Sequence, residues 1–198
     1  MTKREPNARG EGDQLRRDLV DAASRLLLSP QSIALPSLRA VARACSVSPA
    51  AVYLHFASQQ ALISAVIDAQ LDRLSEHIRA RMAGLEAPSE RLDALAAGYV
   101  EWGLAHAGGY QLLFESADRL EIPEHSDDDD RWDLIHNAAA LVIAAGGIGP
   151  DEASVVAFRL WAALHGIVSL RLHKSDVLWP TTVEHETRLV LARLSRGD

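Results

Sequence analysis

Apolar residues recur at helical spacing along most of the chain. The first series begins after a polar and charged stretch of twelve residues and comprises Leu15, Leu19, Ala22 and Leu26. Intervals of three and four residues place these side chains on one face of an α-helix. A Ser-Pro pair at 29–30 ends the series. The pattern predicts a disordered arm over residues 1–12, followed by a helix from residue 14 to about residue 28.

Three serines indicate where the next helices begin. Ser37 precedes a short apolar series, Ser48 precedes Pro49, and Ser58 precedes apolar residues that continue to Ile78. A serine hydroxyl can accept a hydrogen bond from the free N–H groups of a first helical turn, and proline is favoured at the first helical position. We predict a short helix after Ser37, another from Pro49 to about residue 55, and a long amphipathic helix after Ser58.

The remainder of the chain continues in the same way. Helical periodicity covers about 89–107, 110–114, 132–145, 151–173 and 182–195. Thr181 and Glu184 fit a capping box that would open the last helix. No internal repeat and no convincing strand is visible. We therefore predict an all-α protein of about nine helices, with a small helical domain at 13–57 and a larger helical domain at 58–198.

Composition and motifs exclude several classes. The chain has 198 residues, of which 48% are hydrophobic and 24% charged, as expected of a folded soluble protein. Residues 1–11 contain no apolar segment typical of a signal peptide, and the longest uncharged apolar run, Ala138 to Ile148, is too short to span a membrane. Cys45, the single cysteine, can form neither an intramolecular disulfide nor, alone, a metal site. We expect a cytoplasmic protein without a cofactor and without a membrane partner.

Four adjacent carboxylates stand at 127–130. They could bind a cation, but such a run is more often a solvated helix start, where negative charge is stabilised by the helix dipole. We favour the second interpretation and predict no metal site.

Charge is distributed unevenly along the chain. Residues 1–56 contain eight Lys or Arg and five Asp or Glu, a net charge of +3, whereas residues 57–198 contain twelve and twenty-two, a net charge of −10. A basic end on an acidic body indicates that only the N-terminal part meets a polyanion. Chance variation in surface charge is the alternative.

The stretch from Ser37 to Phe56 is the most informative. It contains two short helices joined by a turn of three to four residues, the spacing of a helix-turn-helix, whose second helix enters the DNA major groove. A helical hairpin that only packs fits this spacing equally well. In the first interpretation Val52 and Phe56 point to the core, Tyr53 and His55 donate to phosphate oxygens, and methyl groups contact bases. The predicted DNA-binding residues are Ser37, Arg39, Ser48, Pro49, Ala50, Ala51, Tyr53, Leu54, His55 and Gln59.

Residues 14–75 resemble the DNA-binding region of TetR-family transcriptional regulators. The matching positions are Leu38, Val41 and Ala42, then Val47-Ser48-Pro49, then Val52-Tyr53-Leu54-His55-Phe56, and then Ser58 with Ala61-Leu62. The resemblance implies a homodimer that binds a pseudo-palindromic DNA operator, and a divergent helical domain that binds a small organic effector and releases the DNA. Three positions depart from the family pattern: Ser46 and Ala50 stand where glycine is usual, and Gln59 stands where lysine is usual.

The C-terminal part is similar to one subgroup of that family, whose signature is Trp…His-Gly. Here the signature is Trp161, His165 and Gly166. Tyr99, Trp102 and the segment from Gly109 to Phe114 resemble the same subgroup. Whether these residues bind a ligand or hold the fold stays open at this point.

Aromatic and histidine side chains with helical spacing are candidates for a mainly apolar ligand pocket, although such residues are more often core residues. The predicted pocket residues are Tyr99, Trp102, His106, Tyr110, Phe114, Trp132, His136, Phe158, Trp161 and His165. The last two helices are apolar over much of their surface, which predicts a four-helix dimer interface or, alternatively, two core helices of a monomer. The predicted interface residues are Val156, Leu160, Leu164, Val183, Thr187, Val190, Leu191 and Leu194.

The competing hypothesis is a helical-bundle enzyme or small-molecule binding protein that does not bind DNA. His165 and His173 lie near one helix face, but the sequence contains neither a Glu-x-x-His nor a His-Glu-x-x-His motif, and neither a phosphate-binding glycine loop nor a nucleophile elbow. We therefore expect no catalytic residues. Binding to DNA from upstream of the gene separates the two hypotheses.

Overall fold

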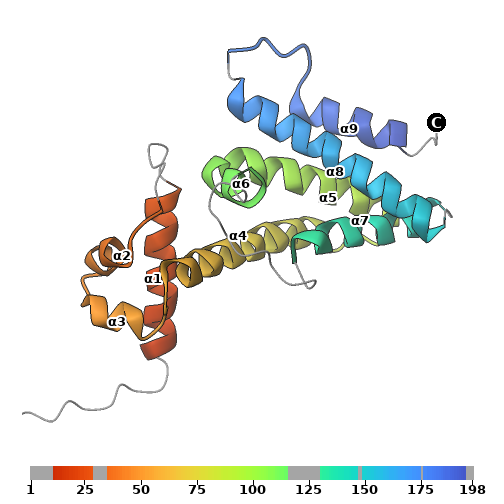
Figure 1. Cartoon of the computed structure of the whole chain (residues 1–198). Coiled ribbons are helices and arrows are strands. Elements are labelled where there is room, and N and C mark those ends of the chain that lie inside the picture. Colours follow the sequence, from red (N-terminus) through yellow and green to blue (C-terminus); the bar gives the residue numbers. More distant parts are fainter. Residues whose placement is uncertain (1–10, 29–34, 116–129, 147–148, 175, 195–198) are drawn as a thin grey trace, which may run out of the picture. The chain divides into compact units, whose positions relative to one another are not determined.

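The structure, a computed structural model, describes residues 11–28, 35–115, 130–146, 149–174 and 176–194. All regular elements in these ranges are helices, which confirms the all-α prediction. The nine described helices are α1 (Glu11–Leu27), α2 (Leu38–Ala44), α3 (Pro49–Tyr53), α4 (Gln59–Met82), α5 (Pro88–Ala105), α6 (Ala107–Phe114), α7 (Asp130–Gly146), α8 (Pro150–His173) and α9 (Val183–Leu194) (Figure 1). Residues 1–10 of the predicted disordered arm and most of the acidic run at 127–130 lie outside the described residues. Glu11 and Gly12 belong to α1, so the helix begins earlier than the sequence predicted.

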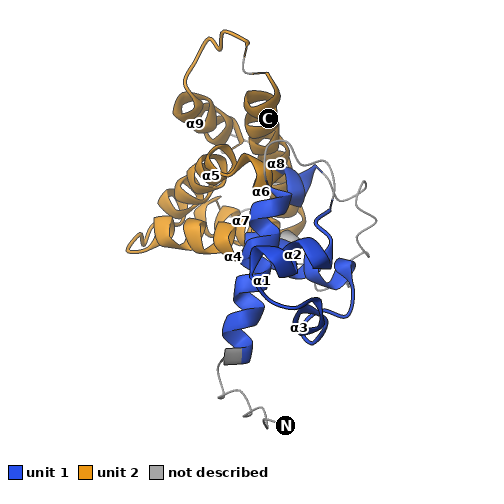
Figure 2. Ribbon diagram, turned by 90° about the vertical axis from the view of Figure 1, so that its left-hand side faces the viewer, with its two compact units in different colours: residues 1–70, 111–123 blue, residues 71–110, 124–198 orange. Residues whose placement is uncertain are grey.

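The helices form two compact units (Figure 2). The first unit covers residues 1–70 and 111–123, and the second covers 71–110 and 124–198. The first unit thus reaches beyond residue 57, where the sequence suggested a boundary. The reason is that Leu62, Ile63 and Val66 of α4 are fully buried and contribute to the core of the first unit.

All three serine start signals are confirmed. The hydroxyl oxygens of Ser37 and Ser48 accept hydrogen bonds from the backbone N–H groups of Ala40 and Ala51, each at 3.2 Å. The hydroxyl of Ser58 accepts one from the N–H of Ala61 at 3.1 Å. Because each cap satisfies an N–H group that the helix itself leaves free, the starts of α2, α3 and α4 are fixed locally by the sequence.

The start of the last helix differs from the predicted capping box. The cap is Thr182, whose Oγ1 accepts from the N–H of His185 at 3.3 Å. Thr181 instead donates its hydroxyl to Glu186 Oε1 at 2.6 Å. The register is shifted by one residue because Glu186 is also held by a guanidinium, a tertiary contact that sequence spacing does not reveal.

That guanidinium belongs to Arg171 of α8. It donates to the Thr181 carbonyl at 2.9 Å and to Glu186 Oε2 at 3.1 Å, and it lies 4.6 Å from the centre of the Trp179 ring. Burial acts to raise the pKa of the Glu186 carboxyl, but the hydrogen bonds from Thr181 and Arg171 outweigh it, so the pKa lies below its usual value. The cluster fastens the segment between α8 and α9 onto both helices.

The turn between α2 and α3 contains a residue in the left-handed region. Ser46 has φ of 56°. A side chain in this conformation costs about 1–2 kcal/mol because its Cβ approaches the following carbonyl oxygen, whereas glycine carries no such penalty. The departure from the family's usual glycine is therefore a departure at a strained position.

We expect Ser46→Gly to raise the free energy of unfolding by about 0.5–1 kcal/mol, the relief of strain less the added chain entropy of glycine. Thermal unfolding followed by circular dichroism measures the change. Ser37→Gly is the matched control: Ser37 has φ of −67° and caps α2, so this variant should lose a few tenths of a kcal/mol. A Ser46→Gly variant no more stable than the wild type would contradict the assignment of strain.

The second unit is built around α5. Helices α7, α8 and α9 each pack against it, and α8 also packs against α7 and α9 (Figure 1). Among the described helices, α8 is the one long and apolar enough to cross a membrane, but its inner face, from Ala153 through Leu160 to Val168, is buried in this helical core. Its outer face exposes Val155, Phe158 and Leu170. One apolar face of α8 is thus covered within the chain, and the opposite face is not.

Two helices approach closely at Gly103 of α5. A Cβ at this position would lie 2.8 Å from Cδ2 of Tyr110 and 2.8 Å from Cγ1 of Val168. Both neighbours are completely buried. The absence of a side chain is therefore what lets α6 and α8 pack against α5 at this point.

Candidate functional site

The helix-turn-helix is held by a small apolar core. Val41 and Val52 are fully buried, and Leu38, Ala42 and Phe56 nearly so, as the sequence predicted. Helix α2 packs against both α1 and α3. Val47, in the turn between α2 and α3, is half-buried. The guanidinium of Arg16 lies 4.9 Å from the centre of the Phe56 ring and covers its outer side. The core fixes α3 so that only one of its faces is packed.

The other face of α3 is open to solvent. Tyr53 is 57% exposed and Leu54 is 84% exposed, although both are large side chains that would normally be buried. Ser37, Arg39, Ser48, Pro49 and Ala50 are also exposed, whereas Ala51 and His55 are half-buried. The structure thus brings seven of the ten predicted DNA-binding residues to the surface at or beside α2 and α3. Ser48 uses its oxygen as the cap acceptor and can still donate its hydroxyl hydrogen to a phosphate.

Gln59 has a structural role that sequence reasoning missed. Its Nε2 donates to the carbonyl oxygens of Leu35 and Pro36, at 3.1 and 3.2 Å. The side chain ties the segment before α2 to the start of α4, so its amide group does not extend freely toward solvent. No local signal could have shown this, since the partners are more than twenty residues away.

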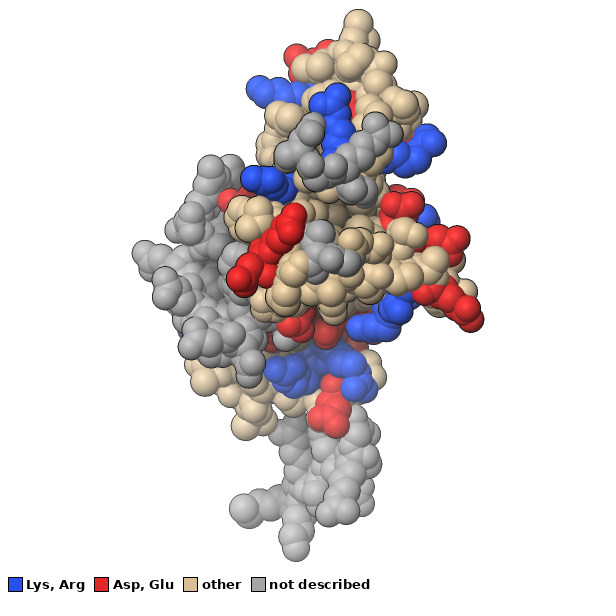
Figure 3. Space-filling model, turned by 90° about the vertical axis from the view of Figure 1, so that its right-hand side faces the viewer, with Lys and Arg blue, Asp and Glu red and all other residues tan. Residues whose placement is uncertain are grey.

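Basic side chains are exposed on the same unit. Arg16 and Arg17 of α1 and Arg39 and Arg43 of α2 are all exposed. On the face of the molecule drawn in Figure 3, by contrast, Lys and Arg are interspersed with Asp and Glu. Exposed arginine side chains are the groups that attract a DNA backbone, although Asp13 and Asp18 are exposed on α1 as well.

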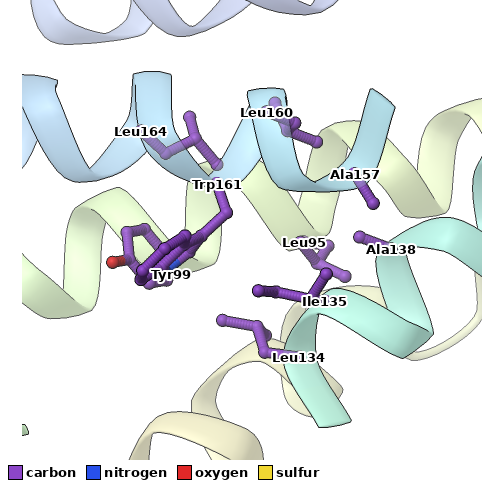
Figure 4. A pocket seen from close by; sticks show the side chains of 9 residues that line it. All are labelled: Leu95, Tyr99, Leu134, Ile135, Ala138, Ala157, Leu160, Trp161 and Leu164. Atoms are coloured by element: carbon purple, nitrogen blue, oxygen red, sulfur yellow. The ribbon is translucent and has the colours of Figure 1, made fainter. Parts of the chain in front are cut away.

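The second unit encloses an apolar cavity among α5, α7 and α8. Their side chains point toward a common space (Figure 4), and the lining residues are Leu95, Tyr99, Leu134, Ile135, Ala138, Ala157, Leu160, Trp161 and Leu164. The cavity volume is about 10 Å³, room for one water molecule. Of the ten pocket residues predicted from sequence, Tyr99 and Trp161 line it. Sequence gave no signal for the aliphatic ones, which look like any other core position.

Most of the other predicted pocket residues lie elsewhere. Trp102 and Tyr110 are buried in the packed core. His106 is exposed and stacks on Trp102 with ring centres 5.0 Å apart, and His136 is exposed on α7. Phe158 is on the outer face of α8, since it follows the buried Ala157 by one residue. Phe114 falls in the first compact unit, and the side chain of Trp132 lies outside the described residues.

Three helices are joined by a chain of hydrogen bonds beside the cavity. Tyr99 Oη of α5 lies 3.1 Å from Tyr110 Oη of α6, which lies 2.6 Å from Nδ1 of His165 in α8. The rings of Tyr110 and His165 are stacked with centres 5.6 Å apart. His165 therefore has a definite structural partner within the chain.

The predicted dimer residues fall into two groups. Leu160, Leu164, Thr187 and Leu191 are buried inside the protomer and do not present their side chains at the surface. Val156, Val183, Val190 and Leu194 are half-buried. The large apolar side chains that are exposed on these helices are instead Val155, Phe158 and Leu170 on α8 and Leu189 on α9. Periodicity identified both helices as apolar but could not decide which apolar side faces inward.

A helix-turn-helix unit joined to a second helical unit defines a class of DNA-binding regulators, and comparison with known sequences gives the family. Residues 19–66 match the family described as "Bacterial regulatory proteins, tetR family", and residues 92–194 match "Tetracyclin repressor-like, C-terminal domain". The chain therefore belongs to the TetR family. It is a DNA-binding transcriptional regulator and not an enzyme. Among curated protein sequences, none matches it.

Solved structures share the fold along the whole chain. A Rhodococcus sp. RHA1 protein of unknown function is 28% identical, with a TM-score of 0.77 over 98% of both chains. A TetR-like transcriptional regulator from the same organism is 21% identical, with a TM-score of 0.69 over 98% of both chains. The multidrug binding protein EbrR, solved with imidazole, is 24% identical, with a TM-score of 0.65 over 96% of both chains.

Proposed function

We propose that this regulator is a repressor that binds a pseudo-palindromic operator as a homodimer and leaves it when a small organic effector binds the second unit. DNA contact by α3 is supported by the burial of only one of its faces. Val52 is completely buried, whereas Tyr53 and Leu54 beside it are exposed. A helix held on one side and open on the other is suited to insertion into the major groove.

The homodimer is supported by the outer face of α8. Val155, Phe158, Ala162 and Gly166 follow one another at intervals of three and four residues, so they form one stripe. A Cβ on Gly166 would meet no atom within 4 Å in the protomer, so close packing inside the chain does not require this glycine. A second copy of α8 that crosses at Ala162 and Gly166 would require a small residue at this position. Arg159 is exposed beside the stripe, which makes a lipid environment costly.

The effector is proposed to have a mainly apolar body. The cavity lined by Tyr99, Trp161 and aliphatic residues has the right chemistry, but its volume of about 10 Å³ admits no organic molecule. Binding must therefore separate α5, α7 and α8. The effector then has a higher affinity for the separated form of the unit than for the closely packed form, and regulation depends on this difference. EbrR is a multidrug binding protein of the same fold, which supports a ligand in the second unit.

We also place the chain in the Trp-His-Gly subgroup and assign its histidine a structural role. The 2.6 Å contact between Tyr110 Oη and His165 Nδ1 holds α6 to α8. Trp161, one turn earlier on α8, lines the cavity. In this proposal Trp161 meets the effector and His165 positions the helix.

A gel shift with DNA from upstream of the gene tests the proposed function. Purified protein should shift a fragment of this DNA at low salt, and a scrambled fragment of equal length should need much more protein. Failure to shift any operator-like DNA at low salt would overturn operator binding by this chain.

Tyr53→Phe should weaken DNA binding about equally for all sequences, because the exposed hydroxyl contacts phosphate and not a base. Affinity should fall about three- to tenfold, the loss of one hydrogen bond to a charged group. Titrations with the operator and with single-base variants measure this. A loss confined to one base pair would show that Tyr53 reads sequence.

A further inference from the structure

The second unit has another hollow, which the mechanism above does not use. It is a groove of about 630 Å³ between the second half of α4, α5 and α7. This volume is within the range of sites that hold small organic molecules, roughly 300–1,000 Å³. The lining residues are Leu71, Asp72, Ser75, Ile78, Arg79, Met82, Arg91, Leu95, Asp133, Leu134, Asn137, Ala140 and Leu141.

The floor of the groove is apolar. Leu71, Ile78 and Leu95 are all buried, so the groove reaches down to the core of the unit. Leu95 and Leu134 line both the groove and the cavity described above, so the two hollows adjoin at these side chains. A molecule resting on this floor would lie directly above the cavity.

The rim carries four charges. Asp72, Arg79, Arg91 and Asp133 are exposed, and none forms an ion pair with another residue in the described part of the chain. Elsewhere in the unit a partner is found: Arg81, one helical turn from His77, contacts Glu101 at 3.0 Å. The groove therefore offers four charges that the described chain does not neutralise.

These charges are separated by sign along the groove. Helices α4 and α7 run in the same direction, from left to right in Figure 1, and Asp133 stands in the first turn of α7. Arg79 follows Asp72 by two helical turns, about 10 Å along the axis. Helix α5 runs the opposite way, with Gly98 beside Ile78, which places Arg91 past Met82. One end is acidic and the other basic.

We propose that this groove binds a linear organic zwitterion, a molecule with an ammonium group and a carboxylate separated by an apolar chain of about 10 Å. The ammonium lies between Asp72 and Asp133, the carboxylate between Arg79 and Arg91, and the chain covers the apolar floor. The groove is a second ligand site, apart from the cavity beside Trp161, and for its consequence on DNA the proposal rests on the proposed function. A ligand that displaces Leu95 and Leu134 would also change the cavity, which the same two side chains line, and the packing of the helices around it.

Calorimetric titration of the full chain at low salt tests the site, with ω-aminooctanoate as the probe and octanoate and octylamine as singly charged comparisons. The zwitterion should bind at least fivefold more tightly than either. Arg79→Gln and Asp72→Asn should each weaken it about three- to fivefold, the range for exposed charge pairs. Arg193→Gln, an equally exposed change on α9 outside the groove, should leave binding unchanged.

A charge reversal sharpens the test. Asp72→Arg should lose the zwitterion, since the new guanidinium repels the ammonium group and can pair with Asp133. All these positions are exposed, and circular dichroism verifies that the variants fold. Equal binding of octanoate and the zwitterion, equal effects of Arg79→Gln and Arg193→Gln, or no binding at millimolar probe would overturn the proposal.

The gel shift separates this proposal from the proposed function. Release of operator DNA by ω-aminooctanoate from the wild type, but not from Asp72→Arg, supports both. Binding by calorimetry without release supports the groove and counts against its role as the effector site. Release by other molecules without any binding of the zwitterion overturns the groove proposal and leaves effector regulation intact.

Discussion

Phe158→Asp is expected to convert the proposed dimer into monomers and to abolish operator binding. Phe158 is 50% exposed and lies with Val155 on the outer face of α8. In a symmetric interface the same patch serves both chains, so each substitution introduces two carboxylates, and burying such a charge without a partner costs several kcal/mol. The dissociation constant should rise at least about a hundredfold. Sedimentation measures the association, and circular dichroism should show unchanged helix content.

Ile143→Asp is the matched control. Ile143 is 37% exposed on α7, away from the stripe, so the same change there should leave the protein dimeric and able to bind DNA. Phe158 tests the interface more directly than Val190, which is half-buried on a helix that packs on its own protomer. A wild type that sediments as a monomer at micromolar concentration, or a Phe158→Asp variant that stays dimeric, would contradict this placement.

Gly103→Ala is expected to lower the free energy of unfolding by about 2 kcal/mol, although alanine is ordinarily the better helix former. The added methyl group would lie 2.8 Å from both Tyr110 and Val168. Tyr110 cannot easily retreat, because it is fully buried and its hydroxyl is bound to Tyr99 and His165. Denaturant unfolding measures the loss.

Two further variants identify the cause. Val168→Ala removes one of the two colliding groups, so Gly103→Ala should cost less in that background than in the wild type. Gly146→Ala, at a helical position where a Cβ meets nothing within 4 Å, should be neutral or stabilising. Additive effects of the changes at 103 and 168 would show that crowding is not the reason.

Local signals in the sequence were enough to place the helices. The serines at 37, 48 and 58 each cap the helix they were expected to cap, because a cap depends on residues only three positions apart. Thr182 in place of Thr181 at the last helix shows the limit. Its register depends on Arg171, which approaches from another helix.

The candidate sites could be predicted from the sequence only where residues close together in the chain determine them. The exposed residues of α3 follow from the burial of Val52 and the helical period, so the exposed surface of this helix could be predicted from the sequence. The cavity could not, because Leu95, Leu134 and Ile135 differ in no way from other core residues until the helices are packed. The rim of the groove combines positions from three helices, and Gln59 binds carbonyls of a distant segment.

The hydrogen-bond chain through Tyr99, Tyr110 and His165 also orders hydrogens. If Nδ1 of His165 accepts from Tyr110, the imidazole is neutral and carries its hydrogen on Nε2, and Tyr99 must then donate to Tyr110. If the imidazole is protonated, Nδ1 donates instead, and the Tyr110 hydroxyl must turn its own hydrogen away from His165 Nδ1, toward Tyr99 or toward the His165 carbonyl oxygen 3.5 Å away. The hydrogen on Nδ1 of one side chain on α8 therefore decides whether the hydroxyl on α6 donates to that ring or accepts from it.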